Sequence, residues 1–156
     1  MLASIIITNY NYGKYLRRCI TSCLNQDFGP QNFEVIVVDD KSSDDSVKII
    51  KDFSRIKNFK FLINKRNIGV AKSANKAIAH SKGKYFIRVD ADDFVSADMS
   101  HFMKTYLESN HDAFCVSCDY VLVSDHEEVI ERKYAEKDNI SCGIMYRRDL
   151  LLESGG

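Results

Sequence analysis

The sequence predicts an α/β domain in which helices cover both faces of one mostly parallel sheet. Short apolar segments typical of buried strands alternate with segments of helical periodicity four times in the first 110 residues. The chain has 156 residues, of which 45% are hydrophobic and 28% are charged. A chain of this length can bury one core, and this composition argues against disorder. We therefore expect one domain over residues 1–156.

The first two predicted strands are each followed by a helix. Residues 4–8 form a short, β-branched, apolar run, and apolar side chains recur at intervals of three and four in residues 15–24. Residues 33–38 form the second apolar run. Residues 42–45 are of the types that cap helix N-termini, which predicts the next helix over residues 47–53.

Two more units of strand and helix follow. Residues 59–63 and 85–89 have the composition of strands. Between them, apolar residues at helical spacing over 70–78 predict a helix that ends at residues 81–83. A fourth helix is expected over residues 97–108.

The last third of the chain lacks this regular alternation. Residues 113–123 and 129–134 are expected to be extended, and residues 140–146 form a last apolar stretch. Residues 147–153 have the pattern of a short helix.

Charge and hydropathy exclude several classes of protein. Lys and Arg total 22, as do Asp and Glu, so no basic excess favours nucleic acid as a partner. No apolar run approaches the roughly 20 residues of a membrane-spanning helix. The N-terminus lacks the basic region and the length of a signal peptide, so we expect a cytoplasmic protein with reduced cysteines. Peripheral association with the inner face of a membrane stays open.

Polar residues stand where three of the predicted strands end. Thr8 begins one such segment, Asp39 and Asp40 form the second, and residues 90–93 contain three aspartates. Parallel strands bring their carboxyl ends to one edge of the sheet, where ligands of α/β proteins bind. Carboxylates gathered there repel one another unless a cation compensates, and a hard divalent ion suits oxygen ligands. A single such Asp is commonly only a turn former or a helix cap, but the joint occurrence favours a site for a metal-bound, phosphorylated small molecule.

Four segments together resemble glycosyltransferase family 2: SIIITNYN at residues 4–11, FEVIVVDD at 33–40, NIG at 67–69 and GKYFIRVDADD at 83–93. The resemblance extends from Ala3 to the end of the chain. It implies the Rossmann-like GT-A fold and an enzyme that inverts the anomeric centre of a nucleotide-sugar donor. Asp-Ala-Asp alone is a frequent triplet, so the combination of segments carries the resemblance.

The resemblance also implies nucleotide-binding residues. Thr8 and Tyr10 would frame uracil or another base, with Tyr10 offering a ring face. Asp39, with Asp40 beside it, would accept hydrogen bonds from the base or the ribose. Residues 1–93 would then form the nucleotide-binding half, and residues 94–156 would begin the acceptor half.

The same resemblance implies a metal site. Asp90 and Asp92 match the Asp-x-Asp motif of the family. Asp90 would face the ribose and the metal, and Asp92 would bind Mn²⁺ or Mg²⁺ on the diphosphate. The metal would act as a Lewis acid that neutralises the departing nucleoside diphosphate.

The sequence departs from the family in two respects. Many relatives carry an arginine at the position of Ala74, and Lys72 is the alternative source of that cation, although a solvated lysine on a helix is the commoner case. The general base for the acceptor hydroxyl is expected beyond Gly156, and Asp119 is a weak candidate within the chain. Since positioned proton transfer contributes about 10²–10⁴-fold, we expect residues 1–156 to bind a nucleotide but to transfer sugar poorly.

The function implied is transfer of a sugar from a nucleoside diphosphate donor, UDP-sugar first, to an acceptor hydroxyl. The acceptor would be a sugar, a lipid-linked or another hydroxyl compound, in the synthesis of cell-surface polysaccharide or glycan. Two alternatives stay open. A module could bind a nucleotide-sugar without turnover, or a related nucleotidyltransferase could make a nucleotide-sugar, although residues 9–14 lack the Gly- and Arg-rich loop of that class.

Overall fold

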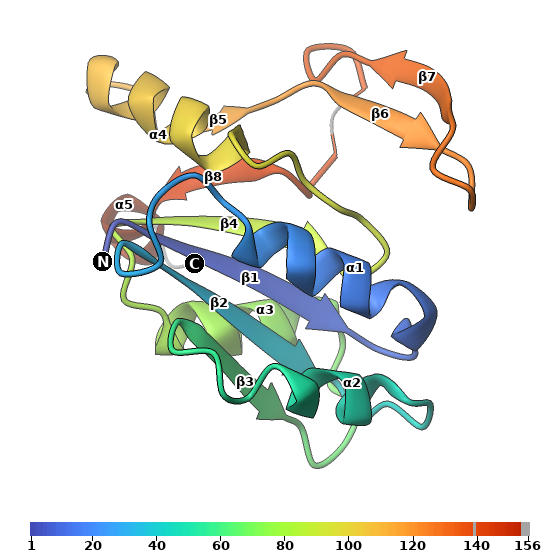
Figure 1. The fold of residues 1–156 in the computed structure, drawn as a ribbon. Coiled ribbons are helices and arrows are strands. Elements are labelled where there is room, and N and C mark those ends of the chain that lie inside the picture. The colour runs from blue at the N-terminus through green and yellow to red at the C-terminus, as the bar shows by residue number, and fades with distance from the viewer. Residues whose placement is uncertain (139, 154–156) are drawn as a thin grey trace.

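The computed structural model describes residues 1–138 and 140–153 and contains a six-stranded mixed sheet of order β3-β2-β1-β4-β8-β5 (Figure 1). Its parallel part is formed by β1 (Ala3–Asn9), β2 (Phe33–Asp39), β3 (Phe59–Ile63) and β4 (Tyr85–Asp90). These four strands are the four that the sequence predicts. Their parallel pairing confirms the α/β fold class.

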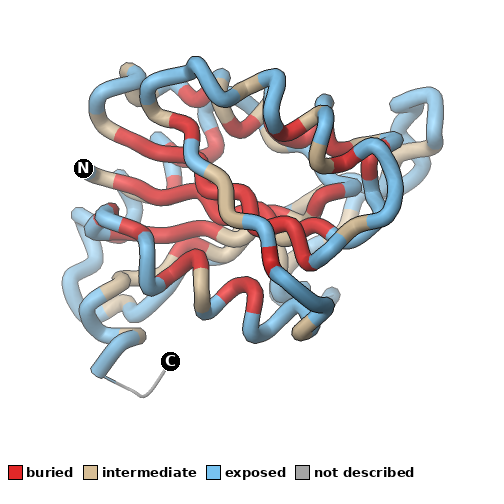
Figure 2. The backbone as a smooth tube through the Cα atoms, turned by 90° about the horizontal axis from the view of Figure 1, so that it is seen from below, coloured by how far each residue is buried: buried red, intermediate tan, exposed pale blue. Residues whose placement is uncertain are grey.

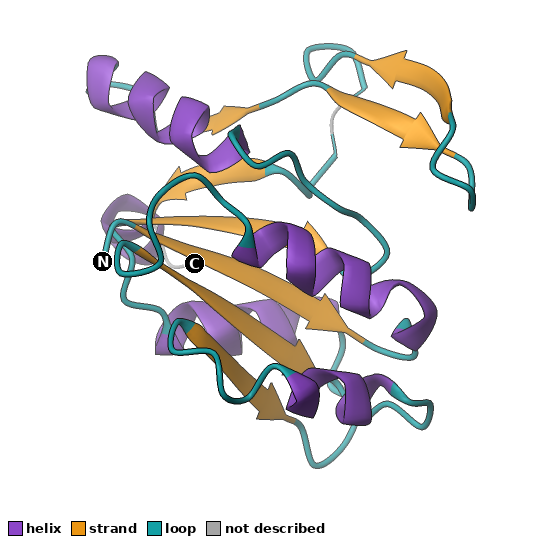
Figure 3. Cartoon of the chain, in the orientation of Figure 1, coloured by secondary structure: helices purple, strands orange, loops and turns teal. Residues whose placement is uncertain are grey.

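Helices lie on both faces of the sheet, as predicted (Figure 3). α1 (Gly13–Leu24) and α2 (Ser46–Asp52) cover one face, and α3 (Val70–His80) and α5 (Arg148–Glu153) cover the other. α4 (Met99–Ser109) packs against β5 and β8 and contributes to the same apolar cluster as α1. Within residues 1–138 and 140–153, no helix is long and apolar enough to cross a membrane.

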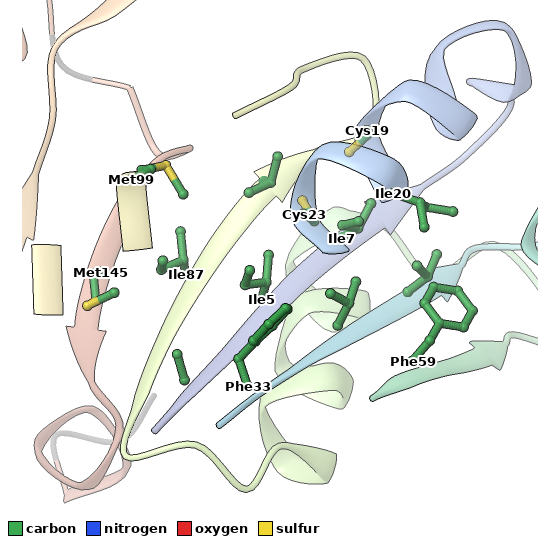
Figure 4. Packing of buried hydrophobic residues seen from close by; sticks show 14 of the residues in the cluster. Ile5, Ile7, Cys19, Ile20, Cys23, Phe33, Phe59, Ile87, Met99 and Met145 are labelled. Carbon is green, nitrogen blue, oxygen red and sulfur yellow. The ribbon is translucent and has the colours of Figure 1, made fainter. Parts of the chain in front are cut away.

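The core consists of two apolar clusters separated by the sheet. In Figure 2 the buried parts of the backbone, in red, follow the parallel strands. Successive side chains of a strand point to opposite faces. Ile5 and Ile7 therefore pack with Cys19 and Ile20 of α1 (Figure 4), whereas Ile6 packs against α3. Each such buried isoleucine contributes about 1.5–3 kcal/mol relative to an exposed one. The continuous apolar runs in the sequence reflect strands covered on both faces.

Residues 42–45 start α2 in a different way from the predicted cap. The residue at the N-cap, Asp45, makes no side-chain capping hydrogen bond. Instead, Asp44 accepts a hydrogen bond from the amide of Ser46 at 3.0 Å and another from the amide of Gly13 at 2.8 Å. One carboxylate thus ties the starts of α1 and α2 together.

The prediction of one extended segment over residues 113–123 is wrong in one respect. β5 (Cys115–Ser117) joins the main sheet, whereas β6 (Tyr120–Val123) pairs with β7 (Val129–Lys133) in a separate two-stranded sheet. Asp119 lies between β5 and β6. It accepts a hydrogen bond from the amide of Ala135 and so holds the segment that follows β7.

The apolar stretch 140–146 becomes a strand only at its end. β8 (Ile144–Arg147) runs antiparallel to both β4 and β5. Gly143 precedes it with φ 66°, a conformation that favours glycine and turns the chain into the strand.

Candidate functional site

A cavity of about 460 Å³ lies at the carboxyl ends of β1, β2 and β4. This is the sheet edge that the sequence predicts for a ligand. The wall is built from the ends of the strands and from the turn before α3. Its residues are Thr8, Asn9, Tyr10, Tyr12, Asp40, Asn67, Gly69, Val70, Ser73, Arg88, Asp90, Ala91 and Asp92.

Most of the predicted site residues meet in this cavity. Thr8, Tyr10, Asp40, Asp90 and Asp92 all line it, although they come from three different strand ends. Tyr10 is 47% exposed, so one part of its ring is open to a ligand. An aromatic face beside hydrogen-bonding groups is suited to stacking a nucleobase.

Asp39 does not line the cavity. It is fully buried and accepts a hydrogen bond from Asn9 Nδ2 at 2.9 Å. The amide of Ser42 at 3.0 Å and its hydroxyl at 2.6 Å occupy further acceptor positions. The sequence predicts that Asp39 contacts the base or the ribose. In the structure its carboxylate oxygens already accept hydrogen bonds from Asn9 and Ser42. Its position makes it a residue that fixes Asn9 and the loop after β2.

Asp40 forms the wall of the cavity next to the turn before α3. It accepts hydrogen bonds from Asn64 Nδ2 and the amide of Gly69, both at 2.8 Å. The amide of Ile68 donates to both of its oxygens. Burial alone would raise the pKa of Asp40, but these donors outweigh it and hold the pKa below its usual value. Asp40 is therefore an ionised anchor for the NIG turn.

The loop after β4 gathers carboxylates. Asp90 and Asp92 line the cavity, and single donor atoms of Asp90, Asp93 and Cys142 all lie within 4.8 Å of one another. Burial raises the pKa of Asp93, and the charges of Asp92 and Asp90 raise it further, while the Cys142 thiol, which donates at 3.0 Å, opposes the rise. Burial and the charge of Asp93 also raise the pKa of Cys142.

This arrangement fits a divalent cation. The charges of Asp90 and Asp92 raise the pKa of Asp93, so negative charge gathers in this loop, and a cation would relieve it. Oxygen ligands suit Mg²⁺ or Mn²⁺. Cys142 adds a softer ligand atom that the sequence analysis did not anticipate, because it lies about fifty residues from Asp93 in the chain.

Arg88 is a further wall residue that sequence reasoning missed. It lies on β4, in an otherwise largely apolar strand, and that isolated charge was the available signal. Its Nη2 lies 3.1 Å from each oxygen of Asp90 and donates to Ser141 Oγ at 2.8 Å.

Two predicted residues lie outside the cavity wall. Lys72 is exposed on α3 and does not line the cavity. Asp119 does not line it either, and its carboxylate accepts from Arg132 and from the amide of Ala135, both at 3.2 Å. The structure thus gives Lys72 and Asp119 no contact with the site that the other residues form.

Taken together, the cavity offers an aromatic face, hydrogen-bonding groups and a carboxylate cluster with one arginine. These are the groups that a nucleotide with a cation-bound diphosphate would use.

Comparison with known proteins places this chain in a family. The family model for Glycosyl transferase family 2 matches residues 4–154. A glycosyltransferase of Haemophilus influenzae whose function is uncharacterised is 36% identical over 110 residues, which is 70% of this chain and 33% of the relative. The poly(ribitol-phosphate) beta-N-acetylglucosaminyltransferase TarS of Staphylococcus aureus is 30% identical over 112 residues, or 71% of this chain and 20% of that protein. The chain therefore spans less than half the length of these relatives.

Solved structures support the fold. S. aureus TarS 1–349 in complex with UDP-GlcNAc superposes with a TM-score of 0.83 at 23% identity, over 99% of this chain and 48% of that chain. The mannosyltransferase PcManGT of Pyrobaculum calidifontis, in complex with GDP-Man and Mn²⁺, superposes with a TM-score of 0.80 at 19% identity, over 99% of this chain and 46% of that one. These matches confirm the predicted GT-A fold.

Proposed function

Because the chain belongs to glycosyl transferase family 2, we propose that it binds a nucleoside diphosphate sugar in the cavity and presents the sugar for transfer, with inversion, to an acceptor hydroxyl. The observation that carries the proposal is the meeting of Tyr10, Asp90 and Asp92 in one cavity from separate strand ends. UDP-sugar is the first donor to test, because TarS, which superposes over nearly the whole chain, was solved with UDP-GlcNAc.

The wall residues divide the donor between them. Thr8 and Tyr10 lie at the end of β1 and are suited to the base, with the Tyr10 ring as a stacking face. Asp40 belongs to the nucleoside side of the cavity. It accepts hydrogen bonds from the amides of Ile68 and Gly69 and so shapes the wall. Asp39 supports the same region from behind through Asn9.

Asp90 and Asp92 would hold Mn²⁺ or Mg²⁺ beside the diphosphate. Their carboxylates supply the oxygen ligands, and the Mn²⁺ in the PcManGT complex supports this choice of ion. When bound, the cation would supply Lewis-acid stabilisation of the leaving nucleoside diphosphate. These residues would hold the ion at the carboxyl end of β4, and the neighbouring Asp93 adds negative charge that would attract it.

On this proposal residues 1–93 form the nucleotide-binding half and residues 94–156 begin the acceptor half. The acceptor is a hydroxyl of a sugar, a lipid-linked carrier or a polymer. The name of TarS, which acts on poly(ribitol-phosphate), supports a role in the synthesis of cell-surface polymer. Such a role is compatible with peripheral association at the cytoplasmic face of a membrane.

The proposal is tested by calorimetric binding of UDP, GDP, CMP and dTDP, each with Mn²⁺ and with a chelator. We expect one nucleoside diphosphate, with UDP as the first candidate, to bind in the presence of Mn²⁺ and to lose most of its affinity in the chelator. Asp92→Asn should reduce the Mn²⁺-dependent part of the affinity by about tenfold or more, because it removes a charged ligand. Asp112→Asn, an exposed aspartate outside the cavity wall, is the matched control. Equal affinity in Mn²⁺ and chelator for all four nucleotides would contradict the proposal.

A further inference from the structure

Arg88 is the only cationic side chain in the cavity wall formed by the described residues. Its side chain is 21% exposed, and it forms an ion pair with Asp90 in which Nη2 lies 3.1 Å from both carboxylate oxygens. The same Nη2 donates to Ser141 Oγ. Nε is buried and has no hydrogen-bond partner in the described part of the chain. The guanidinium therefore has donor capacity that the protein itself does not use.

The charges around Arg88 make this pair unstable towards a second cation. Asp90 pairs with Arg88, and its carboxylate also lies within 4.8 Å of that of Asp93. A divalent cation bound at Asp90 would compete with the guanidinium for the same two oxygens. Two cations at one carboxylate repel each other unless an anion lies between them. A diphosphate is such an anion, since it carries several negative oxygens.

We propose that Arg88, which pairs with Asp90, is the residue that binds the diphosphate of the donor when a divalent cation is held by Asp90. This inference rests on the proposed function. It assigns the positively charged side chain that binds the diphosphate to β4. A planar guanidinium with free N–H groups matches phosphate oxygens in a two-pronged geometry that a lysine cannot reproduce. Lys72, the cation that the sequence suggested, lies exposed on α3 outside the cavity wall.

The proposal predicts selective loss of diphosphate affinity. The experiment measures the binding of UDP and of uridine, in Mn²⁺, to wild type, Arg88→Met, Arg88→Lys and Lys72→Met. Arg88→Met should weaken UDP binding by about tenfold or more and leave uridine binding unchanged, because a charge-assisted hydrogen bond is lost only with the phosphates. Arg88→Lys should recover part of the loss. Equal weakening of UDP and uridine, or a loss with Lys72→Met instead, would overturn the assignment.

A second measurement uses Mn²⁺ alone and needs no nucleotide. Removal of the resident arginine frees Asp90, so Arg88→Met should bind Mn²⁺ severalfold more tightly than wild type, opposite in sign to its effect on UDP. Unfolding or general damage would weaken both. The matched control is Arg17→Met, which breaks an arginine–aspartate pair with Asp52 away from the cavity and should change neither affinity.

The two measurements separate this inference from the proposed function. If wild type binds Mn²⁺ but no nucleotide, the proposed function fails, and the inferred role of Arg88 at the diphosphate fails with it. If wild type binds UDP with Mn²⁺ and Arg88→Met binds both ligands as wild type does, only the inference fails.

Discussion

Glu34 is a buried carboxylate on a strand that is otherwise apolar except at its carboxyl end. It accepts hydrogen bonds from Ser4 Oγ at 2.8 Å, from Lys60 Nζ at 2.5 Å and from the amide of Lys82 at 2.6 Å. Burial alone would raise the pKa of Glu34, but these donors hold it below its usual value. One side chain thus joins β1, β3 and the loop before β4 at the end of the sheet opposite the cavity.

Glu34→Gln should lower the free energy of unfolding at pH 7 by about 1–3 kcal/mol, because an amide cannot accept from all three donors. Since the folded pKa of Glu34 lies below the unfolded one, its stabilisation is complete above about pH 4.3 and is lost as the pH falls through the folded value. Wild type should therefore lose more stability than Glu34→Gln between pH 6 and pH 3. Urea unfolding at several pH values measures this, with the exposed Glu136→Gln as the control. Parallel pH profiles for wild type and Glu34→Gln would contradict the argument.

For single residues of the site, the sequence could predict the strand end at which each lies but not the contacts that its side chain makes. Thr8 and Asp90 could be placed in one cavity because parallel strands share their carboxyl edge. Which of Asp39 and Asp40 faces the cavity could not be predicted, since the choice depends on Asn9 and other partners from distant segments. Arg88 gave a signal, a charge inside an apolar strand, but its pairing with Asp90 requires the register of the folded chain.

At the scale of elements, the turn between β6 and β7 contacts the first helix beside the site. Asp125 accepts hydrogen bonds from Lys14 Nζ and from the Tyr15 hydroxyl, both at 2.8 Å. Arg18, one turn further along α1, donates to Glu127 at 3.2 Å and to the carbonyl of Asp92 at 2.9 Å. Arg18 therefore joins the hairpin, α1 and the loop that holds the carboxylates.

The contact of Arg18 with the Asp92 carbonyl should restrain the loop after β4. Its guanidinium also lies 4.5 Å from the centroid of the Phe94 ring. Arg18→Met should increase hydrogen exchange severalfold at the amides of Asp93 and Val95 in the protein without ligand, because a charge-assisted hydrogen bond is lost. Mass spectrometry of fragments covering residues 90–95 measures the change.

Arg17→Met is the control for this measurement. Arg17 stands next to Arg18 on α1, but it pairs with Asp52 and lies over the ring of Phe53. If both substitutions change exchange in residues 90–95 equally, the effect belongs to α1 as a whole and the restraint by Arg18 is refuted.

At the scale of the whole molecule, the predictable and unpredictable parts of the fold separate at the end of α4. Up to that point each element buries a face in the core around the six-stranded sheet, so the periodicity of apolar residues reveals it. The later strands are short, and β6 and β7 make their own sheet. Val129 and Ile130 of β7 are 69% and 68% exposed, so a hydrophobic composition there does not mark burial in the described structure. No local pattern in residues 113–123 could show which sheet each part joins.

This division predicts two levels of stability within one chain. The central strands β1, β2 and β4 are buried on both faces, and their amides should exchange only through global unfolding. Within the described residues β6 and β7 pair only with each other, and a two-stranded hairpin is at best marginally stable on its own. Their amides should therefore exchange through local opening that leaves the sheet intact.

Hydrogen exchange at increasing urea concentration tests this separation. Exchange in the central strands should accelerate steeply with urea because global unfolding exposes much surface, while exchange in residues 120–133 should be nearly independent of it. Lys14→Met removes one contact of the turn with α1 and should speed exchange in residues 120–133 without changing the central strands. The same urea dependence in both regions would contradict this prediction and make the hairpin part of the cooperative core. The contacts of the hairpin with α1 and with Asp119 would then have to stabilise it as much as a second packed face would.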